Sequence, residues 1–326
     1  MIVDLFAGAG GWDVALRHLH ALDAVGYEHD HDACKTRRAA GMPTVEGDLT
    51  HQPVPTHLEG LIASPPCQSF STAGKRLGLD DARGALVWEP LRWLTACPRW
   101  VAFEQVPEVL PIWRDYARQL TADGYSTWCG LLDAERYGVP QTRRRAILIA
   151  HRDRPVAPPE PTHQRYDHDV PRGDPHACGA DNLFDAGVKP WVSMADALGW
   201  TDEARVGFPR RDDRGDSPDG YRERDWRSAS EPWFAITEKA RSWTVHRPAT
   251  TVTTDSRIAT PGHHDADTRS FGDGSVRLTV AQAAALQTFP PDHPWQGTTT
   301  SQHRQIGNAI PPRLARHILN QLTAPY

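Results

Sequence analysis

Short apolar runs alternate with helix-like stretches through the first half of the chain. The runs are rich in Val, Ile, Leu and Phe, which predicts buried strands, and the stretches between them carry apolar residues at helical spacing. Predicted strands cover residues 2–6, 24–28, 44–46, 60–63, 100–103, 126–133 and 146–150, and predicted helices cover residues 12–19, 86–96 and 108–122. Strands that alternate with helices are typical of a parallel sheet covered by helices, so the pattern predicts an α/β fold.

The pattern changes after residue 150. From residue 151 to about residue 225, Pro, Asp, Arg, Gly and Trp dominate and hydrophobic periodicity is weak. An amphipathic helix is expected over residues 277–289 and a last helix over residues 313–322. A chain of 326 residues has room for one large α/β domain and a smaller one, so we expect the first domain to end near the change in composition.

The cysteines, the histidines and the lengths of the apolar stretches bear on the cell compartment and on metal binding. The five cysteines are widely spaced and include no Cys-x-x-Cys pair, which argues against a disulfide framework or a zinc site. The histidine pairs His29/His31 and His263/His264 have no third ligand at metal-site spacing, so we expect no metal. The N-terminus has no basic leader, and no stretch approaches the ~18–20 apolar residues of a membrane span. We expect a soluble cytoplasmic protein.

Charge says little about partners. The formal net charge of −5 argues against a protein that coats DNA through bulk electrostatics, although a local basic stripe can still bind phosphate. Arg and aromatic residues interleave over residues 221–227 and 233–247. This mixture is compatible with nucleic-acid contact and equally with an irregular charged surface.

A glycine loop joins the first predicted strand to the first predicted helix. Ala7-Gly8-Ala9-Gly10-Gly11 would let the backbone approach a ligand, and the helix that follows would offer free N–H groups. The loop lacks the Gly-x-Gly-x-x-Gly spacing of dinucleotide sites and the Gly-Lys-Ser/Thr of a phosphate loop. It therefore indicates a nucleoside ligand without a phosphate.

Acidic residues follow three of the predicted strands. Glu28 ends the second strand, where a doubly wound sheet places the carboxylate that accepts from ribose hydroxyls. Asp48 follows the third strand, and Glu104 follows the strand at residues 100–103. Each acid alone could equally be a solvated loop residue. The arginines of Gln141-Thr142-Arg143-Arg144-Arg145 enter the next strand, and their position beside these acids favours an anionic substrate over a merely solvated basic face.

Cys67 lies on a loop that Pro65 and Pro66 stiffen, just after a predicted strand. An isolated cysteine is more often a small buried hydrophobe than a nucleophile, so only its surroundings favour a catalytic thiol. The polar residues 71–84 that follow have the length and composition of a mobile lid.

Six stretches of the chain, read together, resemble the DNA cytosine-5 methyltransferases. The resemblance covers nearly the whole chain outside about residues 155–240 and keeps the family's motif order. The six stretches are Asp4-Leu5-Phe6-Ala7-Gly8-Ala9-Gly10-Gly11, Pro65-Pro66-Cys67-Gln68, Glu104-Gln105-Val106, Gln141-Thr142-Arg143-Arg144-Arg145, residues 277–290 with Leu-Gln-x-Phe-Pro, and Gln305-Ile306-Gly307-Asn308-Ala309-Ile310-Pro311-Pro312.

The resemblance implies a fold and a reaction. It implies a Rossmann-like S-adenosylmethionine-dependent methyltransferase domain with a mixed, mostly parallel sheet, formed by residues 1–153 and 277–326. Residues 154–276 would form a small irregular target-recognition domain. The substrate would be double-stranded DNA, with the target cytosine flipped out of the helix. We expect a monomer, with a cognate restriction endonuclease as a possible partner.

The resemblance also implies the site residues. The catalytic group would be Cys67 as the thiolate that adds to cytosine C6, Glu104 as the acid at N3, Arg145 at the O2 edge, and Arg143 in the same motif. The cofactor residues would be Phe6, Ala7, Gly8, Gly10, Gly11, Glu28 at the ribose, Asp48 at the adenine amine, Pro66, and Asn308 at the methionine end.

The chain departs from the family pattern at three positions. Gln105 stands for Asn, His29 stands where an aromatic residue commonly stacks on adenine, and Gln282 stands for Glu. The extra methylene of Gln105 is expected to re-space the loop that carries Glu104 or Cys67. Two alternative functions are a cytosine-5 methyltransferase of RNA and a catalytically silent DNA-binding relative; the intact Cys67, Glu104 and Arg145 argue against the second.

Overall fold

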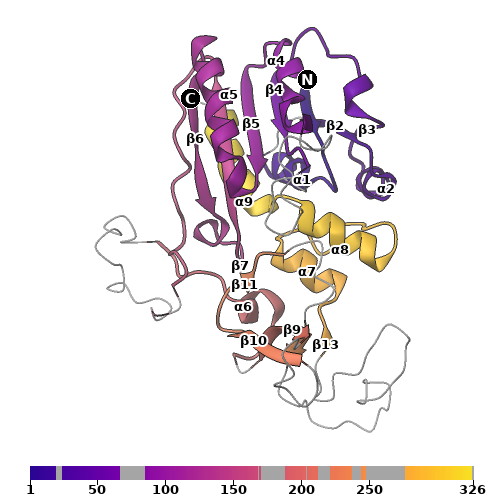
Figure 1. The fold of residues 1–326 in the computed structure, drawn as a ribbon, viewed down its shortest axis with the longest axis vertical. Helices are drawn as coiled ribbons and strands as arrows, with labels where there is room; N and C mark the ends of the chain where they lie inside the picture. Colours follow the sequence, from indigo (N-terminus) through magenta and orange to yellow (C-terminus); the bar gives the residue numbers. More distant parts are fainter. Residues whose placement is uncertain are drawn as a thin grey trace.

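The computed structural model describes residues 1–19, 24–66, 85–167, 169, 188–202, 204–211, 221–236, 244–246 and 276–324. Cys67 and the expected lid at residues 71–84 lie outside these residues. In Figure 1 the described chain has a large sheet covered by helices in its upper half, and short strands and helices in its lower half.

A seven-stranded sheet forms the larger part of the molecule, in the order β3-β2-β1-β4-β5-β8-β6. Neighbouring strands from β3 to β5 are parallel, whereas β8 is antiparallel to both β5 and β6. The expected mixed, mostly parallel sheet is therefore confirmed. The strands are β1 (Ile2–Leu5), β2 (Ala24–Glu28), β3 (Thr44–Glu46), β4 (Gly60–Ala63), β5 (Trp100–Gln105), β6 (Ser126–Asp133) and β8 (Arg144–His151).

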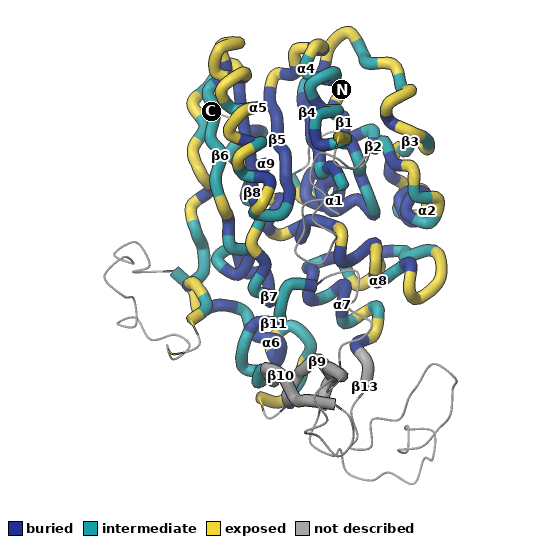
Figure 2. Tube along the Cα trace, viewed as in Figure 1, coloured by how far each residue is buried: buried dark blue, intermediate teal, exposed yellow. Residues whose placement is uncertain are grey.

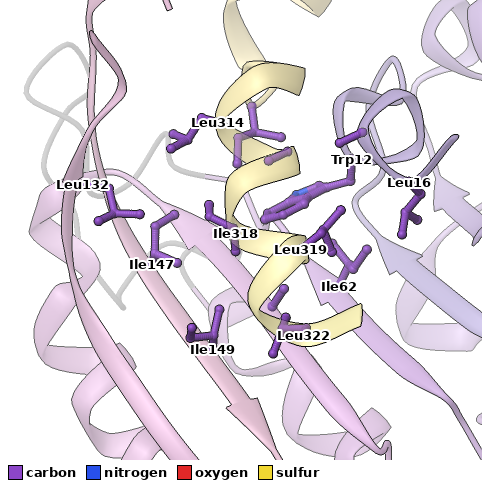
Figure 3. Close-up of a cluster of buried hydrophobic side chains, with 14 of the residues drawn as sticks. Trp12, Leu16, Ile62, Leu132, Ile147, Ile149, Leu314, Ile318, Leu319 and Leu322 are labelled. Carbon is purple, nitrogen blue, oxygen red and sulfur yellow. The ribbon is translucent and has the colours of Figure 1, made fainter. Parts of the chain in front are cut away.

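Helices cover both faces of this sheet. On one face, α1 (Gly11–His18) and α9 (Pro312–Thr323) share a buried cluster with residues of β4, β6 and β8. Figure 3 shows the apolar side chains of α9 directed at Trp12 and Ile62 on one side and at Ile147 and Ile149 on the other. On the opposite face, α4 (Pro90–Leu94) and α5 (Leu110–Ala122) pack in a second cluster. The C-terminal helix thus completes the core that begins with β1.

All parallel strands of the sheet end at the same edge, and that edge carries the polar residues singled out above. Glu28 is the last residue of β2, Ser64 follows β4, and Glu104 lies next to the last residue of β5. Because β8 runs the opposite way, its first residues reach the same edge, with Ala146 opposite Gln105. Ligands of open α/β sheets bind outside this edge, at the point where the strand order reverses. Here the reversal lies between β1 and β4.

The lower half contains smaller elements joined by a third buried cluster, which includes Met194, Trp233, Leu286 and Ile306. Strand β11 (Trp233–Phe234) pairs in parallel with β7 (Gln141–Thr142). A four-stranded sheet has the order β10-β9-β12-β13. Figure 2 shows that buried residues, in dark blue, occur in α7, β7 and α6 as well as in the upper half. The bounds are α6 (Met194–Leu198), β9 (Arg205–Arg211), β10 (Tyr221–Ser228), β12 (Thr244–His246), β13 (Val276–Arg277), α7 (Val280–Leu286) and α8 (Thr299–Asn308).

Several elements differ from those expected from the sequence. The helix expected over residues 86–96 is a 3-10 turn at Leu86–Trp88 followed by α4, since Pro90 begins a new helix. Strand β5 extends through Gln105, and α7 is shorter than expected. Two polar helices were missed, α2 (His31–Ala39) and α8. The Gln-x-Gly-Asn stretch therefore ends α8, and does not open the last helix.

Candidate active site

A cavity of about 610 Å³ opens at the carboxyl edge of the large sheet. It is formed by the loops after β1, β2, β3, β4 and β5, by the start of β8, and by α8. Of the described residues expected in the site, all but Gly10 line it: Phe6, Ala7, Gly8, Gly11, Glu28, Asp48, Pro66, Glu104, Arg143, Arg145 and Asn308. The structure thus brings the expected cofactor residues other than Gly10 into one space with Glu104, Arg143 and Arg145.

At two positions of the glycine loop, Gly10 and Gly11, an added side chain would clash with neighbouring atoms. Gly8 and Gly10 have φ of 53° and 90°. A Cβ on Gly10 would lie 2.4 Å from the sulfur of Met42, and a Cβ on Gly11 would lie 2.4 Å from the carbonyl oxygen of Ile310. Phe6 also has a positive φ, 58°, a strained conformation for a residue with a side chain. The loop is therefore tightly packed behind while its front faces the cavity.

Glu28 fixes the second wall of the cavity. Its Oε2 accepts from the backbone N–H of Gly8 at 2.8 Å, and its Oε1 accepts from the N–H groups of His29 and Asp30, each at 2.7 Å. Burial would raise the pKa of Glu28, but hydrogen bonds from His29, Asp30 and Gly8 outweigh burial and lower the pKa below its ordinary value. Glu28 is therefore an ionised, rigidly held acceptor beside the glycine loop.

Asp48 and His29 form a more exposed part of the rim. Asp48 caps the 3-10 turn Leu49–His51, and its Oδ1 accepts from the N–H of Thr50 at 2.9 Å. The hydrogen bonds from Thr50 lower the pKa of Asp48. The ring of His29 lies 3.2 Å from Glu28, and this contact raises the pKa of His29. Both side chains line the cavity.

The segment that precedes Cys67 is held from two sides. Trp12 Nε1 donates to Ser64 Oγ at 3.0 Å, and the side-chain amide of Gln105 donates to the carbonyl oxygen of Pro65. The Oε1 atom of Gln105 also accepts from the N–H of Val106 at 2.5 Å. The side chain of Gln105, which is one methylene longer than that of Asn, therefore bridges the ends of β4 and β5. Sequence reasoning missed Trp12, whose position directly after the glycine loop was the available signal.

Glu104 and Arg145 form an ion pair inside the cavity. Arg145 Nε lies 2.8 Å from Glu104 Oε1, and the side chains are 15% and 5% exposed. Arg145 Nη1 also donates to the carbonyl oxygen of Arg144 at 2.8 Å.

Arg143 is used differently, although it also lines the cavity. It is fully buried, and its guanidinium donates to the carbonyl oxygens of Ile236 at 2.8 Å and of Gly307 and Ala309 at 3.1 Å. Gln141 donates to Leu286 O at 3.0 Å and accepts from Ile236 N at 3.0 Å. These two side chains join the segment after β11 to the ends of α7 and α8.

A buried charge cluster lies behind the glycine loop, and sequence reasoning missed it. Arg37 forms a bidentate ion pair with Asp13, with distances of 2.7 and 2.9 Å. Burial, followed by the charge of Asp13, raises the pKa of Asp4 well above its ordinary value. A polar residue inside the apolar β1 was the signal for Asp4, whereas no sequence pattern links Asp13 to Arg37. The cluster braces the loop because Arg37 also reaches the carbonyl oxygen of Ala7 at 3.5 Å.

In the part of the chain that the structure describes, no helix is long and apolar enough to cross a membrane. Within the same residues, no group of three or more His, Cys, Asp or Glu side chains could hold a metal ion.

Comparison with known proteins gives concordant matches. The model for C-5 cytosine-specific DNA methylases matches residues 1–324. Type II methyltransferase M1.HphI of Haemophilus parahaemolyticus is 29% identical over 342 residues, which cover 97% of this chain and 84% of the relative. Type II methyltransferase M.AquIA of Picosynechococcus sp. is 31% identical over 224 residues, which cover 60% of this chain and 87% of the relative.

Solved structures agree on the fold. The S. pombe Dnmt2 methyltransferase has a TM-score of 0.60 and 14% identity, covering 98% of this chain and 97% of that chain. A mutant of DNMT2 from Spodoptera frugiperda has a TM-score of 0.63 and 14% identity, covering 98% of each chain.

The strand order and the likeness to both DNMT2 structures define a methyltransferase fold, with the cavity at the carboxyl edge of its sheet. The match over residues 1–324 narrows this class: the chain belongs to the C-5 cytosine-specific DNA methylase family. The resemblance inferred from the six sequence stretches is therefore confirmed, and so is the enzyme class, DNA (cytosine-5-)-methyltransferase.

Proposed function

We propose that this chain binds S-adenosylmethionine and methylates C5 of a flipped cytosine in double-stranded DNA through a covalent bond to Cys67. The observation that carries the proposal is that the Glu104–Arg145 ion pair and Pro66, the residue before Cys67, line the same cavity as Glu28 and the glycine loop. Membership of the cytosine-5 methylase family supports the choice of base and position.

The cofactor end of the cavity fits a phosphate-free nucleoside. A carboxylate held by three N–H groups suits ribose hydroxyls, and Glu28 is 8% exposed at the cavity wall. Gly8 has no atom within 4 Å of the position of an added Cβ, so its open side leaves room for a ligand. Asp48 would accept from the adenine amine, and Asn308, the exposed last residue of α8, would hold the methionine end. When bound, S-adenosylmethionine would supply a sulfonium methyl group that an activated C5 can attack, with S-adenosylhomocysteine as the leaving group.

The target end supplies the activation. Cytosine C5 becomes nucleophilic when the thiolate of Cys67 adds to C6 and the ring electrons move toward C5 and N3. Glu104 shares a proton with N3 and so stabilises the added ring, while Arg145 holds Glu104 and donates to O2. A solvent water molecule then takes the C5 proton, the electrons of the C5–H bond expel the Cys67 thiolate, and the N3 proton returns to Glu104, which restores the aromatic base.

Base flipping and sequence recognition complete the proposal. The cavity lies at a sheet edge, where a base inside a duplex could not enter, so the target has to leave the stack. We assign sequence recognition to residues 154–276 and the chemistry to residues 1–153 and 277–326. Arg143 then acts as a positioning residue, since it binds both Ile236 in the proposed recognition region and Ala309 in the proposed catalytic region.

Transfer of a labelled methyl group tests this function. The full chain is incubated with S-adenosylmethionine labelled in its methyl group and with either duplex DNA of varied sequence or structured RNA, and the product nucleosides are separated. Labelled 5-methylcytosine in DNA, absent with Cys67→Ala, is the expected result. Label in RNA alone, or in another base, would contradict the proposal.

A further inference from the structure

An ion pair crosses the rim of the cavity between two segments far apart in the sequence. Arg304 Nη2 on α8 lies 2.6 Å from Oδ2 of Asp30, the residue that directly precedes α2. Both residues line the cavity, and their side chains are 45% and 30% exposed. The pair therefore joins the wall formed by α8 to the wall formed by the end of β2.

Asp30, the partner of Arg304, also contacts Glu28. Its backbone N–H donates to Glu28 Oε1 at 2.7 Å, and its Oδ1 caps α2 by accepting from the N–H of Ala33 at 3.0 Å. The remaining carboxylate oxygen receives Arg304. Arg304, Asp30 and Glu28 thus form a chain of contacts that ends on the proposed ribose acceptor.

The other end of the chain of contacts is fixed by a neighbouring hydrogen bond. Gln305, the next residue of α8, accepts from Thr36 Oγ1 of α2 at 2.7 Å, and both side chains are buried. Asn308 follows Arg304 by one helical turn, on the same face of α8. A shift of α8 at Arg304 would therefore change the position of Asn308 relative to Glu28.

We propose that Arg304 is a positioning residue for the cofactor: through Asp30 it holds Glu28 and Asn308 at the separation that the bound cofactor requires. This inference rests on the proposed function, because it takes the cavity to bind S-adenosylmethionine. Arg304 need not touch the cofactor, and its contribution should be electrostatic and sensitive to salt.

The chain contains a matched control. Arg38 Nη1 lies 2.6 Å from Glu46 Oε2, with side chains 48% and 29% exposed, which closely matches the Arg304–Asp30 pair. Arg38 also belongs to α2, but neither Arg38 nor Glu46 lines the cavity. Removing either arginine should have the same small effect on stability, and only Arg304→Gln should affect the cofactor.

Calorimetry on the full chain, without DNA, tests the proposal with S-adenosylmethionine. Because exposed ion pairs are weak, we expect Arg304→Gln to increase the dissociation constant for S-adenosylmethionine by roughly two- to fivefold. Arg38→Gln should leave that dissociation constant unchanged. Arg304→Lys should restore part of the affinity. Asp30→Asn keeps the helix cap, since Asn caps as well as Asp, and should weaken binding as Arg304→Gln does, with no further loss in the double variant.

Salt provides a second readout. The ratio of the two dissociation constants, variant to unaltered chain, should fall toward one at about 1 M salt, where the screening length is about 3 Å. Equal dissociation constants for Arg304→Gln, Arg38→Gln and the unaltered chain at low salt would overturn the inference and leave the proposed function standing. Failure of the unaltered chain to bind S-adenosylmethionine would overturn both.

Discussion

The indole N–H of Trp12 donates a hydrogen bond to the hydroxyl of Ser64 across 3.0 Å. Trp12 lies in the first turn of α1, directly after the glycine loop, and Ser64 lies three residues before Cys67. The glycine loop and the segment that leads to Cys67, which the proposed mechanism has to bring to one base, are therefore tied together. Their relative position is set by the protein before either ligand binds.

Trp12→Phe should slow methyl transfer more than it weakens cofactor binding. Phe keeps the aromatic packing of Trp12 in its buried cluster but removes the donor to Ser64, which lowers stability by about 1 kcal/mol. Ser64→Ala should give a similar fall in kcat, and the double variant should be no slower than the single ones. Tyr116→Phe is the control, because it removes a buried hydrogen bond to Val87 and neither residue lines the cavity. An equal loss of kcat in Tyr116→Phe would contradict the link between the loops.

Gln105→Glu should reduce kcat by about tenfold or more, since it replaces the N–H donor to Pro65 with a second acceptor. The substitution keeps the size of the side chain, so packing alone cannot explain a loss. Gln105→Asn, the residue typical of the family, should be less harmful but still slower than Gln105, because its shorter amide has to span the same gap. Single-turnover rates measure both. A rate for Gln105→Glu equal to that of the unaltered chain would exclude Gln105 from positioning the loop.

Arg143 and Arg145 should separate in a pair of lysine substitutions. Arg143→Lys should lower the free energy of unfolding by about 2–4 kcal/mol, because one ammonium cannot reach three carbonyl oxygens held by the guanidinium. Arg145→Lys should leave stability nearly unchanged and reduce kcat by about tenfold or more, because it disturbs the pair with Glu104. Urea unfolding and steady-state kinetics give the two readouts. The reverse pattern would show that Arg143 is the arginine that acts on the base.

Glu28 gives a prediction on pH. Its pKa is lowered in the folded chain, so its contribution to stability is fully present above the unfolded value of about 4.3 and is lost as the pH falls through the folded value. Glu28→Gln should lower stability at pH 7 by at least about 1.5 kcal/mol, since an amide cannot accept from all three N–H groups. The difference between the two proteins should shrink at pH 3. A difference that stays constant from pH 7 to pH 3 would contradict the ionised state of Glu28.

The sheet and much of the site could be predicted because local patterns specify them. Most strands of the large sheet contain a short apolar run, and Glu28 and Glu104 come at strand ends, which a parallel sheet gathers at one edge. Helices α2 and α8 were missed because their polar sequences lack an apolar stripe. They are held instead by tertiary hydrogen bonds such as Thr36–Gln305.

Contacts across long sequence separations account for the rest. Arg143 meets Ile236 and Ala309, which lie 93 and 166 residues further along the chain. The motif that contains Arg143 and Arg145 does not show that backbone carbonyl oxygens of distant segments hold the Arg143 guanidinium. The ion pair of Asp13 on α1 with Arg37 on α2 likewise joins residues that only the fold brings together.

Covalent trapping on DNA that carries 5-fluorocytosine at the target tests the central claim most directly. After addition of Cys67 to C6 and methyl transfer, fluorine cannot leave C5 as a cation, so elimination stops and the protein should stay attached to the DNA after denaturation. We predict an S-adenosylmethionine-dependent adduct that mass spectrometry locates on Cys67, that is absent in Cys67→Ala, and that forms much more slowly in Glu104→Gln. An adduct on Cys34, Cys97, Cys129 or Cys178, or full trapping in Cys67→Ala, would contradict the proposed mechanism.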